Sequence, residues 1–332
     1  MPDFSRVLCA VDLTEPSRRA LDCALWWARR HGADVSVLHI HRLVIPPPET
    51  GTVPGDLTAG APAVPVMDQA PLTADERQAC QLDVERFVEQ ARTDGLQIEV
   101  LLDEDPSVAD AIVARADALA ADLVVVGAGT EPASDHPVLG RITADVLRAA
   151  PCSVLVIPTP GADVANPCVA GLTRIMCPVS LSDESRPLLA SAAALATETG
   201  AHLTIVHVVE LFSEVAALAY DFDAHREARV QPACDALVAL IADVVGRDKP
   251  VEEVVAQGNA SEEILKLAIE ESTGLIVVGR GAGREGRGAG GPTAPAVACQ
   301  ARCPVLFLHQ DVAAISRPFA SDSRPEPRAA AR

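Results

Sequence analysis

Short apolar runs recur along the chain, and each is followed by a polar turn and a longer amphipathic segment. The runs VLCAV from Val7 and IMCPV from Ile175 are too short for stable helices, which indicates buried strands. The residues from about Pro16 to His31 place apolar side chains on one face, and Gly32 follows, as is typical of a helix that ends at a glycine. The pattern therefore predicts alternating strands and helices.

The same alternation continues through the rest of the first half. Further strands are predicted from Val35, Ile98 and Leu123, with helices between them. Because these strands are apolar on both faces, they indicate a parallel sheet covered by helices on both sides. The predicted fold class is therefore α/β with doubly wound parallel sheets, in which ligands bind at the carboxyl ends of the strands.

This unit occurs twice in the chain. Residues 5–39 align without a gap with residues 173–207, and Cys9 is matched by Cys177. The later segments repeat as well, since ADLVVVG in the first half is matched by TGLIVVG in the second. A match of this length exceeds what shared helix periodicity produces, so the sequence predicts two homologous domains in tandem.

The domain boundaries follow from where the repeat begins and ends. The first copy carries a proline-rich insert after its second strand, which we expect to be a mobile loop. A linker joins the copies, and the final segment is too polar and proline-rich to pack. The predicted parts are domain 1 at 1–158 with its insert at 45–72, a linker at 159–172, domain 2 at 173–310 and a disordered tail at 311–332.

Composition narrows the class of protein. Hydrophobic residues make up 49% of the 332 residues, which is enough for two packed cores, and the formal net charge is -19. Such a charge repels a phosphate backbone, so no nucleic acid is expected as a partner. The N-terminus shows no export signal and no apolar run reaches membrane-spanning length, so we expect a cytoplasmic protein without a membrane partner.

The residue types of catalysis and metal binding do not form a recognisable set. The nine cysteines include no C-x-x-C pair, which favours reduced, buried thiols. His39 and His207 repeat at the end of the second strand of each copy, where structural hydrogen bonds are expected. The motifs of nucleophile elbows, zinc proteases and P-loops do not occur in the sequence. The sequence therefore predicts neither an enzyme nor a metal site.

The order of these motifs resembles the universal stress protein family. A first strand ends in V-D, a Ser-Arg pair opens the next helix, and a late VVVG run precedes a glycine loop and a closing strand. The resemblance covers both repeats and implies Rossmann-like domains of the adenine nucleotide alpha hydrolase type. It also implies pseudo-twofold packing of the two domains through their closing strands, Ser153–Ile157 and Pro304–Leu308.

In nucleotide-binding members of that family, the resemblance implies an Asp that contacts adenine and a G-x2-G-x9-G-(S/T) loop around the phosphates. Glycines let backbone N–H groups approach phosphate oxygens, and the following helix presents its positive end to the anion. The first copy matches this pattern in most positions. The candidate ATP-binding residues are Ala10, Val11, Asp12, Ile40, Gly127, Gly129, Gly140, Arg141, Ile142 and Thr143.

Two positions of the first copy depart from the family pattern. Thr130 stands where the second glycine is expected, and Arg141 replaces the small hydroxyl. The Arg141 guanidinium either clamps a phosphate with two hydrogen bonds or lies in solvent at the start of a helix. Asp12 also has two interpretations: it either contacts the adenine, or it belongs to a turn in which Asp12 or Thr14 caps the next helix.

The second copy is more altered. Ser180 occupies the position of the adenine carboxylate, Ala282 that of the second glycine, and Pro292 that of the loop hydroxyl. A proline there removes an N–H group that a phosphate would need. Arg280, Arg284 and Arg287 make this loop basic, which suggests either an anion site or a solvated loop. Domain 2 is therefore predicted to be degenerate and mainly structural.

The function that the resemblance implies is ATP binding in domain 1, with or without Mg²⁺, which reports a stress state to an unknown protein partner. A homodimer is a further expectation. The alternative is a nucleotide-free stress scaffold that acts through protein contacts. A nucleotide hydrolase would need an unrecognised carboxylate such as Asp103 to position a water, while the acidic run at Asp103–Asp105 works against polyphosphate unless magnesium intervenes.

Overall fold

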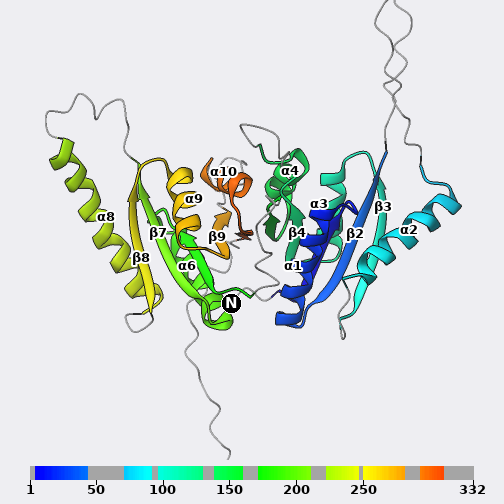
Figure 1. The fold of residues 1–332 in the computed structure, drawn as a ribbon, viewed down its shortest axis with the longest axis horizontal. Coiled ribbons are helices and arrows are strands. Elements are labelled where there is room, and N and C mark those ends of the chain that lie inside the picture. Colours follow the sequence, from blue (N-terminus) through cyan, green and yellow to red (C-terminus); the bar gives the residue numbers. More distant parts are fainter. Residues whose placement is uncertain are drawn as a thin grey trace, which may run out of the picture.

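Strand and helix alternate through both halves of the chain, as the sequence predicts (Figure 1). The structure is a computed structural model that describes residues 4–43, 71–91, 96–129, 138–159, 171–210, 222–246, 250–280 and 292–309, with only the backbone for 222–228. Most of the predicted insert, most of the linker, the tail, Thr130, Ala282, Arg284 and Arg287 lie outside the described residues.

The first half contains five strands and four helices in the part of the chain that the structure describes. Apolar runs form the strands, and the amphipathic segments between them form the helices. These elements are β1 Arg6–Val11, α1 Glu15–His31, β2 Asp34–Arg42, α2 Ala74–Glu89, β3 Ile98–Asp105, α3 Val108–Ala118, β4 Leu123–Gly127, α4 Arg141–Ala149 and β5 Ser153–Ile157.

The second half repeats this order. As predicted, α1 ends at a glycine, Gly32, whose backbone is left-handed with a φ of 65°. Its counterpart in the second half also ends at a glycine, Gly200. The elements are β6 Arg174–Pro178, α6 Ser185–Thr199, β7 His202–Val209, α8 Phe222–Val244, β8 Val251–Gln257, α9 Ala260–Glu270, β9 Leu275–Arg280, α10 Thr293–Gln300 and β10 Val305–His309.

All ten strands form one sheet, in the order β3-β2-β1-β4-β5-β10-β9-β6-β7-β8. Neighbouring strands are parallel except β5 and β10, which pair antiparallel with Leu155 opposite Leu306. This pairing confirms the predicted contact between the closing strands. The two halves lie side by side about an approximate twofold axis through that pair, as Figure 1 shows.

The sheet separates two hydrophobic cores, and each core runs through both domains. Successive strand residues point to opposite faces, so Cys9 lies in one core and Leu8 in the other. Helices α1, α2, α6 and α8 supply the first core, and α3, α4, α9 and α10 supply the second. Helices thus cover both faces of the sheet, which confirms the doubly wound arrangement.

Polar contacts also join the domains beside the β5–β10 pair. The backbone N–H of His309 donates to Ser153 Oγ at 3.1 Å. The Arg280 guanidinium donates to the carbonyl oxygen of Cys152 at 2.9 Å and to that of Ala150. Because Ala150 is the C-cap of α4, Arg280 places its charge at the negative end of that helix. The structure therefore gives Arg280 a role between the domains rather than in an anion-binding loop.

We expect Arg280→Ala to destabilise the contact between the domains. The guanidinium is partly buried, and burial lowers the pKa of Arg280 from its usual value. Its removal leaves two carbonyl groups without their charged donor, so the free energy of unfolding should fall by about 1.5–3 kcal/mol. Arg148→Ala is the matched control, because Arg148 makes an exposed ion pair with Asp145 worth about 0–1 kcal/mol. Equal losses in urea denaturation would contradict the role of Arg280.

Candidate functional site

The predicted site of domain 1 lies at the carboxyl ends of β1 and β4. These strands are adjacent and parallel, with Cys9 opposite Val125. Val11 and Gly127 lie two residues further along each strand, so both strands end at the same edge of the sheet. In parallel α/β sheets the ends of the strands are where ligands bind. The fold thus brings Asp12 and the glycine loop to one edge.

Asp12 forms a tight turn directly after β1. Its Oδ1 accepts hydrogen bonds from the backbone N–H of Thr14 at 3.1 Å and from Thr14 Oγ1 at 2.5 Å. Leu13 between them has a φ of 62°, and Leu181, at the same position of domain 2, has a φ of 59°. Leucine rarely adopts this conformation, so strained backbone is kept at the end of the first strand in both domains.

Within the structural interpretation of Asp12 and Thr14, the structure favours the turn over the helix cap, while the adenine-binding interpretation of Asp12 remains a prediction. Thr14 occupies the N-cap position of α1, but its side chain makes no capping hydrogen bond there. Asp12 itself is exposed to solvent. Partial burial alone would raise the pKa of Asp12, but hydrogen bonds from Thr14 and Ser17 outweigh it and lower the pKa below its usual value. Asp12 is therefore an exposed carboxylate at neutral pH.

This environment predicts how Asp12 titrates. A carboxyl whose pKa is lowered on folding stabilises the protein above its unfolded pKa, about 3.9, and that stabilisation is lost as the pH falls through the folded pKa. Thr14→Val removes one of the hydrogen bonds, so it should raise the pKa of Asp12 and reduce stability near neutral pH. Carbon-detected NMR of the Asp12 carboxyl checks this prediction, and a pKa that Thr14→Val does not change would contradict it.

The two described ends of the glycine loop, at Ala128–Gly129 and at Gly140, meet before α4. The N–H of Gly140 donates to the carbonyl of Ala128 at 2.9 Å, and Gly129 has a left-handed φ of 64°. A Cβ at Gly140 would lie 2.9 Å from the Gly129 oxygen, and one at Gly129 would lie 3.3 Å from the Gly140 Cα. Gly129 thus provides the left-handed residue of the loop, one position before Thr130, and Gly140 permits the close approach.

Thr143, in the first turn of α4, forms a hydrogen bond with the residue at which this loop begins. Its hydroxyl donates to the Gly127 carbonyl at 2.7 Å, and its side chain is buried. The hydrogen bond ties α4 to the end of β4. The sequence predicts Thr143 as a direct binding residue, whereas in this structure its hydroxyl hydrogen is used within the protein.

Arg141 and Ile142 point to solvent at the start of α4. The Arg141 side chain is 95% exposed, and its Nε lies 3.8 Å from Asp145 Oδ2 one turn along the helix. Ile142 is 46% exposed. The structure therefore places Arg141 as its solvated interpretation expects.

The remaining predicted residues, Ala10, Val11 and Ile40, lie near the ends of β1 and β2 and are buried or partly buried. Ala10 and Ile40 are partly buried and pack against the core, and Val11 is buried. The Val11 carbonyl accepts a hydrogen bond from His39 Nδ1 at 2.9 Å, and His207 makes the same bond to Val179 in domain 2. These bonds confirm the predicted structural role of both histidines.

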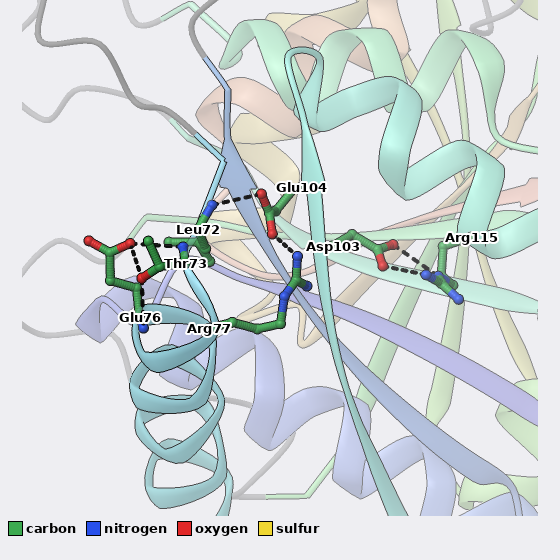
Figure 2. Close-up of polar contacts among 7 residues, drawn as sticks. All are labelled: Leu72, Thr73, Glu76, Arg77, Asp103, Glu104 and Arg115. Carbon is green, nitrogen blue, oxygen red and sulfur yellow. Dashed lines mark hydrogen bonds and ion pairs between the residues drawn. The ribbon is translucent and has the colours of Figure 1, made fainter.

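Two of the three carboxylates of the acidic run at the end of β3, Asp103 and Glu104, pair with arginines, as Figure 2 shows. Asp103 accepts from Arg115 Nε at 3.0 Å and from its Nη2, so the carboxylate is held by both groups. Glu104 accepts from the Leu72 N–H at 3.0 Å and from Arg77. The pairing with Arg115 gives Asp103 a structural role. Because two carboxylates of the run are paired with arginines, the run repels a polyphosphate less than the sequence alone suggests.

Helix α2 begins beside this run. Thr73 and Glu76 form a reciprocal capping box, in which the Thr73 backbone N–H donates to Glu76 at 2.9 Å (Figure 2). The cap fixes the first turn of α2, from which Arg77 reaches Glu104. The sequence shows the Thr-x-x-Glu pattern, but the pairing with β3 depends on a contact over 27 residues.

The equivalent turn of domain 2 is built from hydroxyl groups. Ser180 Oγ lies 2.9 Å from Ser182 Oγ and 3.3 Å from Ser185 Oγ, and the Ser180 N–H donates to Ser185 Oγ at 3.2 Å. Ser180 therefore replaces the carboxylate of Asp12 with a neutral group in the same kind of turn.

A cavity of about 750 Å³ lies above the strand ends of domain 2. Its wall includes Ser180, His207 and Gly279 from the strand ends, Leu188 from α6 and Ile264 from α9. The sequence pattern does not predict it, because the lost family residues indicate a structural role for domain 2. The repeat could have indicated this cavity, because Ser180 and Gly279 in its wall align with Asp12 and Gly127 of the candidate site in domain 1.

Metal and thiol chemistry find no support in the described residues. No group of three or more His, Cys, Asp or Glu side chains among them could hold a metal ion. The described cysteines are free thiols, and five are buried. Burial raises the pKa of the Cys177 thiol to about 12. No described helix is long and apolar enough to cross a bilayer.

Known proteins share this architecture. The model of the universal stress protein family matches residues 3–158 and 171–309. A universal stress protein from Archaeoglobus fulgidus DSM 4304 has a similar structure, with a TM-score of 0.60, 18% identity, and 94% of this chain and 98% of that chain covered. A protein of unknown function from Pseudomonas aeruginosa PAO1 gives a TM-score of 0.59 at 17% identity, with 92% and 93% covered. A search of curated proteins gave no match. Since the family model matches both halves, the chain belongs to the universal stress protein family, as a tandem two-domain member.

Proposed function

We propose that domain 1 binds an adenine nucleotide such as ATP. The observation that carries this proposal is the position of the exposed Asp12 carboxylate, whose pKa is lowered, next to a glycine loop that leads into α4. A carboxylate can accept a hydrogen bond from the adenine amino group. The N-terminal N–H groups of a helix attract phosphate. Both groups lie at the same edge of the sheet.

The wall and the loop fit the two ends of such a ligand. Ala10, Val11 and Ile40 offer apolar surface and backbone groups to the flat base, while Gly129 and Gly140 let the phosphates approach the backbone. Arg141 is an exposed cation at the start of α4, and a bound phosphate offers it a better partner than Asp145 at 3.8 Å. Magnesium would arrive with ATP, because Asp103 and Glu104 already pair with arginines.

Nucleotide binding would report a metabolic or stress state to a protein partner. Domain 2 would then stabilise domain 1 through the β5–β10 pair and the Arg280 contacts. The proposal includes two further expectations: that the chain forms a homodimer, and that an unidentified protein partner responds to the bound nucleotide.

A nucleotide-free scaffold is the second candidate. It is favoured by two hydrogen bonds that occupy predicted site groups, namely Asp12 with Thr14 and Thr143 with Gly127. In this alternative the turn and the loop are structural features only. Neither candidate requires catalysis.

Calorimetric titration of the intact chain with ATP, with and without magnesium, separates the two candidates. Nucleotide binding predicts a stoichiometry near one, which is lost in Asp12→Ala and kept in Ser180→Ala, the matched change in domain 2. No heat at millimolar ATP would reject the proposal in favour of the scaffold. Turnover of ATP above the buffer control that Asp12→Ala abolishes would contradict the non-enzymatic proposal.

A further inference from the structure

The cavity of domain 2 has the size of a small-molecule site. Its volume of about 750 Å³ lies within the range of roughly 300–1,000 Å³ that is usual for ligand pockets. It lies where the chain passes from β6 to its neighbours β7 and β9, the part of a doubly wound sheet where ligands bind. A cavity of this size is unexpected in a domain with a purely structural role.

The inner wall of the cavity is apolar. It includes buried side chains from both faces of the sheet, and Ala294 lies where domain 1 has the polar Thr143. These residues present no hydrogen-bonding side chain to a ligand. They are Leu188, Val206, Ile264, Val278, Ala294 and Val297. The body of a ligand that fits this wall is therefore apolar.

Most polar side chains of the described wall can accept hydrogen bonds, and the hydroxyls among them can also donate. The His207 Nδ1–H donates to the Val179 carbonyl at 2.9 Å, so Nε2 of the neutral ring is an acceptor. Glu184 and Glu210 add carboxylates, against the single guanidinium of Arg229. The described lining thus has an excess of one negative charge, within a chain whose formal net charge is -19. This field favours a cation and disfavours an anion.

The equivalent positions of domain 1 also indicate that the domain 2 cavity favours a cation over an anion. Glu210 follows the second strand of domain 2 at the position that Arg42 has in domain 1, which reverses the charge. Pro292 is the N-cap of α10, at the position of Arg141, and has no N–H group for a phosphate. Among the described residues, domain 2 thus has a carboxylate in place of the Arg42 cation, and a proline in place of the backbone donor at position 141.

We propose that the domain 2 cavity binds a small organic ammonium compound, with an apolar body against Leu188 and Ile264 and the ammonium group near Glu210. The hydroxyl cluster of Ser180 and Ser185 and the Nε2 of His207 accept or relay its remaining hydrogen bonds. The site is independent of nucleotide binding in domain 1.

A pair of probes with opposite charge tests this proposal on the intact chain. Tryptamine and indole-3-propionate share the indole body but carry an ammonium and a carboxylate group. Calorimetry should show binding of tryptamine, and indole-3-propionate should bind at least about tenfold more weakly. No tryptamine binding at millimolar concentration, or equal binding of the two probes, would overturn the proposal.

Two variants locate the binding. Glu210→Lys should weaken tryptamine at least about tenfold, and Val208→Phe should also weaken it because the new side chain fills the cavity. Ile40→Phe is the matched change at the equivalent position of domain 1 and should leave tryptamine binding unchanged. Tryptamine binding that neither Glu210→Lys nor Val208→Phe weakens, or that Ile40→Phe abolishes, would overturn the assignment to domain 2.

Competition with ATP keeps the two proposals distinguishable. Tryptamine should bind Asp12→Ala with unchanged affinity, and ATP should not displace it from the wild-type chain. Displacement by ATP that persists in Asp12→Ala would show that the cavity takes nucleotides and would overturn the ammonium proposal. Tryptamine binding in a chain that binds no ATP would support this inference while rejecting the proposed function of domain 1.

Discussion

Gly140→Ala should abolish most ATP binding by domain 1 and reduce its stability. The new Cβ would lie 2.9 Å from the Gly129 oxygen and 3.0 Å from the Ala128 oxygen, and both are backbone atoms that cannot rotate away. The loop must open to relieve the contact, which moves the start of α4. Overpacking of this kind costs about 1–3 kcal/mol, so ATP affinity should fall at least about tenfold.

The control for this variant is another glycine of the same loop. A Cβ at Gly127 meets no atom within 4 Å, so Gly127→Ala should leave thermal stability unchanged. The family pattern contains both glycines, but in the structure only Gly140 lacks room for a Cβ. Melting temperatures and ATP titrations of the two variants test the difference. Equal stability losses would contradict the close approach of Gly129 and Gly140.

Trp27→Ala should cause a large loss of stability in domain 1. Trp27 is 1% exposed and packs between Phe4, whose ring centroid lies 5.3 Å away edge-on, and the stacked ring of His31 at 5.4 Å. Truncation of a buried tryptophan leaves a cavity and costs about 3–5 kcal/mol. The urea midpoint of domain 1 should fall accordingly.

The neighbouring tryptophan provides the control. Trp26 is only partly buried, on the side of α1 where Arg30 approaches its ring at 5.9 Å. Trp26→Ala should therefore cost clearly less than Trp27→Ala. Circular dichroism and ATP binding, followed together in urea, report the loss of domain 1. A loss in Trp26→Ala that equals that in Trp27→Ala would contradict the assignment of Trp27 to the core.

Local pattern was enough to predict much of the fold. Short apolar runs predicted β1, β4 and the closing strands, because a buried parallel strand needs apolar side chains on both faces. Gly32 predicted the end of α1, since a glycine accepts the left-handed backbone that ends a helix. The gapless repeat predicted two domains of the same kind.

The site was less predictable, because its contacts join residues that are far apart in sequence. The pairing of Arg77 with Glu104 and that of Arg280 with the end of α4 depend on which elements the fold brings together. The left-handed Leu13 had no sequence signal, since leucine disfavours that conformation. The cavity of domain 2 lies between the strand ends and the surrounding helices, and no sequence motif predicts the size of that space.

Hydrogen exchange of the intact chain with and without ATP tests the central claim, which is that ATP binds to domain 1 and not to domain 2. ATP should slow exchange at the turn of Asp12 to Thr14 and at Gly129 and Gly140, and should leave the turn at Ser180 unchanged. Protection at Ser180, or no protection in either domain at saturating ATP, would contradict the account.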